Sequence, residues 1–178
     1  MLTWLARLLG FGTGSGTSRR SLAWQAGAPD PEVRRRAAEQ LATVTEPWAG
    51  ELLFALFKDM IPDVRTAARA ALQHQGTAAT AVLVRALESA DPKVAVPAAE
   101  LLGAGKDLDA VRPLLLVMKF GAPEVRAAAT RALISYGRAA IPGLMLACED
   151  PDPWTRTRGE EILAAIRAAE NPSPSPPS

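Results

Sequence analysis

Histidine and cysteine are almost absent from this sequence of 178 residues: His74 and Cys148 are the only residues of their types. A single cysteine excludes an intrachain disulfide and any site that needs several thiolates. With one histidine beside it, a metal centre built from the usual His and Cys ligands cannot be assembled. We therefore expect no metal and no cofactor, and the composition suits a reducing cytoplasm.

Aromatic residues and an excess of charge are also scarce. Aromatics make up 5% of the chain against 48% hydrophobic residues, and the formal net charge is +1. Alanine and leucine carry the apolar fraction, which favours packed helices because strands prefer aromatic and β-branched residues. Proteins that hold nucleic acid by its phosphates usually show a basic excess, so we expect no nucleic-acid partner. No apolar run reaches the roughly 18 residues that a membrane-spanning helix needs.

Prolines recur at a nearly constant interval along the chain. Pro31, Pro62, Pro92, Pro123 and Pro153 are separated by 31, 30, 31 and 30 residues. Three columns follow the prolines at four-residue steps: Val33, Val64, Val94, Val125 and Thr155; then Ala37, Ala68, Ala98, Ala129 and Gly159; then Leu41, Leu72, Leu102, Leu133 and Leu163. Such steps place all three columns on one helical face. A fixed period of this length predicts a stacked array of repeats.

Each repeat is expected to contain two helices. Proline suits the first turn of the first helix, and Asp30, Asp91 and Asp152 precede it as N-caps. Ile61 and Ala122 take that place in the second and fourth repeats, so those helices should lack a side-chain cap. The second helices contain three further apolar columns: Ala49, Ala79, Ala110 and Ala140; Leu53, Leu83, Leu114 and Leu144; and Phe57, Leu87, Met118 and Cys148. The alanine columns predict that neighbouring helices approach closely.

The segment DPEVRRRAAEQL, which begins at Asp30, resembles the short bacterial HEAT-like repeat typified by the phycobilisome lyases, with its D-P-x-V-R-x-x-A-A-x-x-L pattern. DPWTRTRGEEIL, from Asp152, follows the same pattern with three substitutions. The resemblance covers roughly residues 30–169 and implies an all-α, right-handed α-solenoid of about five helical-pair repeats. We accordingly divide the chain into an N-terminal amphipathic segment with a Gly-rich linker (1–28), the repeat domain (29–170) and a Pro- and Ser-rich tail (171–178), expected to be disordered.

The families that this repeat resembles include enzymes, and each needs residues of its own. Deoxyhypusine hydroxylases hold a di-iron centre with His-Glu pairs, and this chain has no such dipeptide. Chromophore lyases bind a phycobilin, for which no motif is present. DNA glycosylases built from similar repeats need a basic groove, but the basic run 34–36 is flanked by Glu32 and Glu39. Cys148 lies in a core column and His74 at a predicted helix end, so we expect no catalytic residue and no enzyme.

Two expectations concern contacts between repeats, and a third concerns the helices of the third repeat. The Arg column, Arg34, Arg65, Arg126 and Arg156, with Ala95 in the third repeat, has two interpretations. It is either exposed to solvent or, as the resemblance to HEAT-like repeats implies, forms a ladder to acidic or carbonyl groups of the adjacent repeat, and its regularity favours the ladder. Lys58, Glu88, Lys119 and Glu149 alternate in sign, which predicts ion pairs between successive repeats. Pro97 and Pro113 fall inside helices of the third repeat, where we expect a bend or faster amide exchange.

The tryptophans are the best candidates for contact with a partner, because large surface aromatics often anchor interfaces. Trp48 stands between two helices of the first repeat, and Trp154 takes a polar position in the fifth. The alternative is that both pack over the end repeats. Trp4 belongs to the apolar arc of residues 1–11, for which contact with a groove or membrane surface and a cap docked on the first repeat remain open. Arg85 and Arg112, on second helices, complete the candidates.

These observations favour a non-enzymatic scaffold, adaptor or assembly factor that binds another protein through its repeat surface. The alternative is a lyase-like or chaperone-like factor acting on a cofactor-bearing protein. In either case we expect a cytoplasmic protein, with the proline-started helices on the outer face of the superhelix and the second helices on the inner face.

Overall fold

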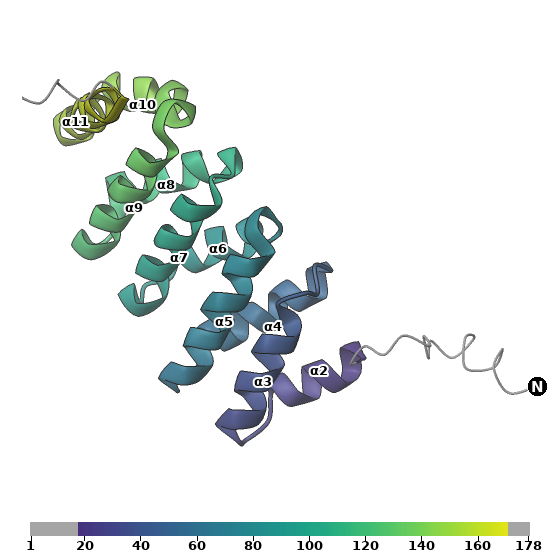
Figure 1. Cartoon of the computed structure of the whole chain (residues 1–178). Helices are drawn as coiled ribbons and strands as arrows, with labels where there is room; N and C mark the ends of the chain where they lie inside the picture. Colours follow the sequence, from purple (N-terminus) through teal and green to yellow (C-terminus); the bar gives the residue numbers. More distant parts are fainter. Residues whose placement is uncertain (1–17, 171–178) are drawn as a thin grey trace, which may run out of the picture.

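The computed structural model describes residues 18–170, and every regular element in this range is a helix. The helices form two rows in a stack (Figure 1). The first row consists of α3 (Pro31–Leu41), α5 (Pro62–Gln75), α7 (Pro92–Gly105), α9 (Pro123–Tyr136) and α11 (Pro153–Glu170). The second row consists of α4 (Pro47–Phe57), α6 (Thr80–Leu87), α8 (Val111–Phe120) and α10 (Ile141–Cys148). The expected all-α solenoid of about five helical-pair repeats is confirmed.

The helices of the first row begin as the sequence predicts. Pro31, Pro62, Pro92, Pro123 and Pro153 are each the first residue of their helix. The carboxylates of Asp30, Asp91 and Asp152 accept hydrogen bonds from first-turn amides, at 2.9, 2.9 and 3.0 Å. Ile61 and Ala122 make no side-chain cap. Three of the five helices therefore have an N-cap that stabilises their first turn, by about 1 kcal/mol each.

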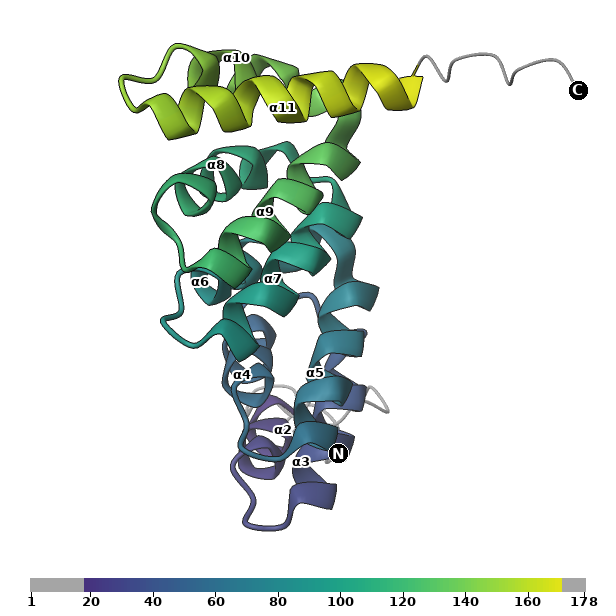
Figure 2. The same cartoon turned by 90° about the vertical axis from the view of Figure 1, so that its left-hand side faces the viewer.

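The repeat columns form the core. The alanines of the first-helix column are fully buried, as are the alanines of the second-helix column and most of the leucines of both. The fifth repeat differs, because Leu163 is only half-buried while Ile162 and Ile166 are 1% exposed. The physical reason is the orientation of α11, which crosses α9 at a wide angle while α7 and α9 run side by side (Figure 2). A rotated helix presents a different face to its neighbour, so Leu163 is not the core residue that its column predicted.

The second and fourth repeats share a glycine turn, whereas the first helix of the third repeat ends at Lys106 (φ 54°) before a 3₁₀ turn of its own, η2 (Leu108–Ala110). In the second and fourth repeats the first helix ends at a glycine with positive φ, Gly76 (57°) or Gly137 (58°), and a 3₁₀ turn follows, η1 (Gly76–Ala79) or η3 (Gly137–Ala140). Glycine adopts this conformation without the steric cost that a Cβ would add. The last helical residues, Gln75 and Tyr136, occupy equivalent positions and both contact the preceding repeat. The side-chain amide of Gln75 donates to two carbonyls there, and the single hydroxyl proton of Tyr136 is shared between two.

Helices of the first row are packed in pairs. α3 lies closely against α5 and α7 against α9, whereas the contacts of α5 with α7 and of α9 with α11 are much smaller. At the α7–α9 contact, a Cβ added to Gly103 would lie 2.9 Å from the Cα of Ala132, so only glycine allows this approach. The first-row helices therefore form two close pairs, α3–α5 and α7–α9, followed by α11, while α6 also packs on α7 across the boundary between the pairs.

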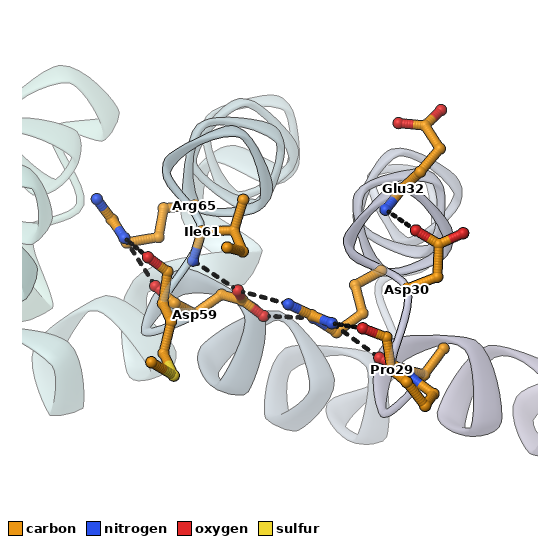
Figure 3. A network of polar contacts seen from close by, with 9 residues as sticks. Pro29, Asp30, Glu32, Asp59, Ile61 and Arg65 are labelled. Atoms are coloured by element: carbon orange, nitrogen blue, oxygen red, sulfur yellow. Dashed lines mark hydrogen bonds and ion pairs between the residues drawn. The ribbon is translucent and has the colours of Figure 1, made fainter.

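The Arg column binds the loops that lead into its own helices. The Nη1 groups of Arg34, Arg65 and Arg156 each donate to two carbonyls in the loop before their own helix, at 2.8–2.9 Å. Arg34 alone also bonds an acidic side chain, through both carboxylate oxygens of Asp59 in the loop that leads into the second repeat (Figure 3). Hydrogen bonding from Arg34 holds the pKa of Asp59 below its usual value. The expected ladder is therefore present in part: Arg65 and Arg156 bond carbonyls at the end of the preceding repeat, and Arg34 bonds an acidic group, whereas Arg126 makes no such bond.

A short helix precedes the first repeat. α2 (Arg19–Ala26) is capped by Ser18, and its Leu22 is 1% exposed because α2 packs on α3 and α4. The sequence had indicated only an amphipathic segment and a linker before residue 29, without a helix at this place. The predictions for residues 1–11, Trp4 included, and for the tail 171–178 lie outside the described residues.

The predicted ladder of alternating charges between repeats is wrong. No ion pair joins Lys58, Glu88, Lys119 and Glu149, all of which are described: Lys58 lies over the ring of Phe54, and Lys119 bonds Asp150 at 2.7 Å. Nearer groups outcompete the predicted partners.

The prolines of the third repeat leave its helices continuous. α7 runs unbroken through Pro97, and Pro113 lies in the first turn of α8, where a missing N–H costs little. The structure does not test the predicted faster amide exchange.

Candidate binding surfaces

The described tryptophan candidates have different surroundings. Trp48 is half-buried, packs against the core and lies 5.8 Å from the guanidinium of Arg19 on α2. This contact supports the interpretation that Trp48 covers an end repeat. Trp154, at 37% exposure, lies between the guanidinium groups of Arg126 and Arg158, with centroid distances of 4.9 and 5.4 Å. Trp154 therefore remains accessible to a partner.

The two arginine candidates also differ. Arg85 on α6 forms an ion pair with Glu51 on α4 and lies 4.5 Å from the ring centroid of Phe54. These contacts join two neighbouring second helices, which gives Arg85 a structural role on the surface. Arg112 is exposed on α8 and has no partner among residues 18–170. The structure does not bring Arg112 together with either tryptophan in a single site.

The second helices of the third and fourth repeats present large apolar side chains to solvent. Phe120 and Leu146 are 73% and 72% exposed, and Leu116 and Met145 are more than half exposed. Leu116 and Leu146 stand at equivalent positions on α8 and α10, which are in contact. The corresponding residues of the first two repeats are Ala55 and Arg85. At this position the second-helix face therefore carries a small and a charged residue on α4 and α6, and large apolar residues on α8 and α10.

Phe120 stands where other repeats place a hydrogen-bonding residue. Asp59, Ser89 and Asp150 occupy this position, three residues before the helix proline, and each accepts a hydrogen bond from the amide two residues later, at 2.9, 3.2 and 2.9 Å. Phenylalanine cannot make this bond, and its ring lies exposed instead. An alignment of the repeats contains this signal, because Phe120 is the aromatic exception in a mainly polar column. Phe120 is not among the residues predicted from the sequence to contact a partner.

A hollow of about 420 Å³ adjoins Phe120 on the surface between the end of α6 and α8. Its apolar lining comes from Leu87, Leu116, Val117, Phe120 and Val125, and Glu88 lies at its edge. A concave apolar surface with exposed anchors beside it is typical of a site for protein or small-molecule binding.

Cys148 and His74, which the sequence predicts to be inert, lie outside this surface. Cys148 is half-buried, not fully buried as its column predicted, and burial raises the pKa of its thiol. A raised pKa disfavours the reactive thiolate. His74 is exposed at the end of α5. Residues 18–170 contain no cluster of three His, Cys, Asp or Glu side chains that could hold a metal, and within the same range no helix is long and apolar enough to cross a membrane.

The two-row stack, the proline-started helices and the buried columns define an α-solenoid of HEAT-like repeats. Residues 79–164 match the family model described as HEAT repeats. This part of the chain therefore consists of HEAT repeats, and the same repeat pattern begins in the sequence at Asp30.

Two solved structures are similar to this chain. One is the complex of CpcE and CpcF of phycocyanin lyase from Nostoc sp. PCC7120, with a TM-score of 0.50 and 23% identity over 87% of this chain and 67% of that chain. The other is an engineered protein, with a TM-score of 0.45 and 20% identity over 84% of this chain and 79% of that chain. The first likeness shows the fold. No curated protein sequence matches the chain.

Proposed function

We propose that this chain is a non-enzymatic scaffold or assembly factor that binds another protein through the apolar surface of α8 and α10. The observation that supports the proposal is the exposure of Leu116, Phe120, Met145 and Leu146 on two adjacent helices. Water-exposed apolar groups of this size lower the solubility of a monomer, and their burial against a partner is favourable, at about 25 cal/mol per Å². In a stacked array each repeat buries its core faces against its neighbours, so this surface is left for a partner.

Position-specific cross-linking in the source cells tests the proposal. A photoreactive residue at position 116 or 146 of the full chain should form a covalent product with one partner protein. The matched control carries the same residue at position 24, because Trp24 is also an exposed aromatic, at 70%, but lies on α2. Products of equal yield from positions 24 and 146 would contradict a partner surface on α8 and α10.

Polar substitution provides the second measurement. Leu116→Ser and Leu146→Ser together should weaken retention of the cross-linked partner by tenfold or more, because each truncated anchor costs about 1–2 kcal/mol at an interface. Trp24→Ser should leave it unchanged. Since all three side chains are exposed, the thermal unfolding of the variants should match that of the parent chain.

The alternative is a lyase-like factor acting on a cofactor-bearing protein, and the apolar hollow beside Phe120 is the observation that favours it. Its volume of about 420 Å³ falls in the range of small-molecule sites. Under this alternative the full chain alone should bind a free phycobilin and change its absorbance spectrum. Phe120→Ser should abolish the change.

A further inference from the structure

A second hollow lies on the opposite row of helices, between α9 and α11. It has a volume of about 360 Å³ and forms where α11 turns away from α9 at a wide angle (Figure 2). The residues that line it are Pro123, Arg126, Ala127, Thr130, Arg131, Trp154 and Arg158. Three of the seven are arginines and none is acidic.

Arg126 departs from the structural role of its column. Arg34, Arg65 and Arg156 bind the carbonyls of the loop before their helix. Arg126 makes no such bond, and its guanidinium lies over the ring of Trp154 at 4.9 Å. Arg126 is thus oriented toward the hollow in place of its own loop.

Trp154 is a second exception to the repeat pattern, and it lines the same hollow as Arg126. The residue after the helix proline is charged in the other repeats, as Glu32, Asp63, Lys93 and Glu124. Such positions in the first turn are normally polar and solvated. Here a tryptophan stands between Arg126 and Arg158. Two exceptions to the repeat pattern that meet in one hollow indicate a role beyond folding.

The positive charge of this hollow is poorly neutralised. Arg126 has no carboxylate partner among residues 18–170. Arg131 lies 3.9 Å from Glu100, which is bound more closely, at 2.7 Å, by Arg69. Of the three arginines, only Arg158 forms a close ion pair that no other arginine shares, with Glu161 at 2.7 Å. An anion that enters the hollow would therefore meet at least one unpaired guanidinium beside an aromatic ring.

We infer that this hollow binds an acidic peptide segment of a protein partner. Carboxylates of the segment accept hydrogen bonds from Arg126 and Arg131, as guanidinium groups bind carboxylates with two parallel bonds. The ring of Trp154 contacts the apolar part of the segment and holds the guanidinium of Arg126 in place. The site is separate from the apolar surface of α8 and α10 and does not depend on the function proposed for that surface.

Titration of the full chain with a fluorescently labelled glutamate-rich peptide tests this inference. Fluorescence anisotropy should show saturable binding that weakens as the salt concentration rises. Arg126→Gln should lower the affinity about fivefold, the size expected for one partly exposed ion pair. Trp154→Leu, which keeps every charge, should also weaken binding. Arg112→Gln is the matched control, since it removes one exposed arginine from the other row of helices and should leave the affinity unchanged.

Three outcomes would overturn the inference. An equal loss in Arg112→Gln would mean that only net charge attracts the peptide. Absence of saturable binding would mean that the hollow has no affinity for carboxylates. A single-stranded oligonucleotide that binds more tightly than the peptide, with the same loss in Arg126→Gln, would assign the hollow to nucleic acid. Matching thermal unfolding curves for Arg126→Gln and the parent chain would ensure that the losses come from the site.

Discussion

The guanidinium of Arg34 donates two hydrogen bonds to the carboxylate of Asp59 at the junction of the first two repeats, with Nε 2.6 Å from Oδ2 and Nη2 3.0 Å from Oδ1. The same Oδ1 accepts from the amide of Ile61, and Nη1 of Arg34 bonds two loop carbonyls (Figure 3). One side-chain pair therefore connects two loops, and its side chains are only 16% and 11% exposed.

Asp59→Asn should destabilise the chain by about 2 kcal/mol, because it leaves the largely buried charge of Arg34 without its partner. Urea denaturation followed by circular dichroism measures the loss. Asp63→Asn removes an exposed acid from the first turn of α5 and should cost less than about 1 kcal/mol. Equal losses of stability in the two variants would show that the Arg34–Asp59 pair contributes no more than an exposed acid does.

Tyr136 should titrate far above the usual tyrosine range. Burial, together with the charge of Asp107, raises the pKa of its hydroxyl from 10.0 to about 12. It is the only tyrosine of the chain, so absorbance of the tyrosinate reports this group alone. A raised pKa means that the unfolded chain loses its proton first, so stability should fall as the pH rises from about 10 to 12. A midpoint near 10 in the folded chain would contradict the buried hydroxyl.

Two glycines of α7 should respond to alanine in opposite directions. Gly103→Ala places a Cβ 2.9 Å from the Cα of Ala132 and should destabilise by about 1–3 kcal/mol, despite the better helix propensity of alanine. Gly105→Ala meets nothing within 4 Å and should be neutral or stabilising by up to about 1 kcal/mol. Thermal unfolding of the two variants distinguishes them, and stabilisation by Gly103→Ala would disprove the close α7–α9 contact.

The first half of α7 should exchange its amide protons faster than the equivalent half of α9. Pro97 donates no hydrogen bond inside α7, so the helix lacks one of its internal bonds there. Hydrogen exchange measured by mass spectrometry should show the difference between segments 92–99 and 123–130. Pro97→Ala should remove it, and equal protection of both segments in the parent chain would contradict the prediction.

Burial within the repeats was predictable from the sequence because it depends on local periodicity. Ala68 and Leu72 are buried wherever a helix packs with that face inward, and the columns specify that face. Ile162 was not predictable in the same way, because the crossing angle of α11 decides which face is inward. The charge alternation failed for a related reason: Lys119 has Asp150 within reach, and sequence spacing does not rank competing partners.

The candidate surfaces were predictable only in part. Trp154 was found because a tryptophan in a polar column is conspicuous, whereas its neighbours Arg126 and Arg158 became relevant only once α9 and α11 were seen together. Phe120 could have been found by comparing loop positions, because it replaces the hydrogen-bonding residues Asp59 and Ser89 of other repeats. That its ring is exposed was visible only in the structure. α2 gave little signal, since a short helix with one buried residue, Leu22, has almost no periodicity to read.

The pairing of repeats restricts how such a chain can change in length. Pro31 and Pro92, like Pro62 and Pro123, are 61 residues apart, and Gln75 and Tyr136 make equivalent bonds within their pairs. Loss of the second repeat, for example, would place α3 against α7, and neither helix has the glutamine or tyrosine that joins the two members of a pair. Duplication or deletion of 61 residues would instead reproduce contacts that already exist. Solenoids of this type should therefore lengthen in evolution, and be extended by engineering, in steps of two repeats.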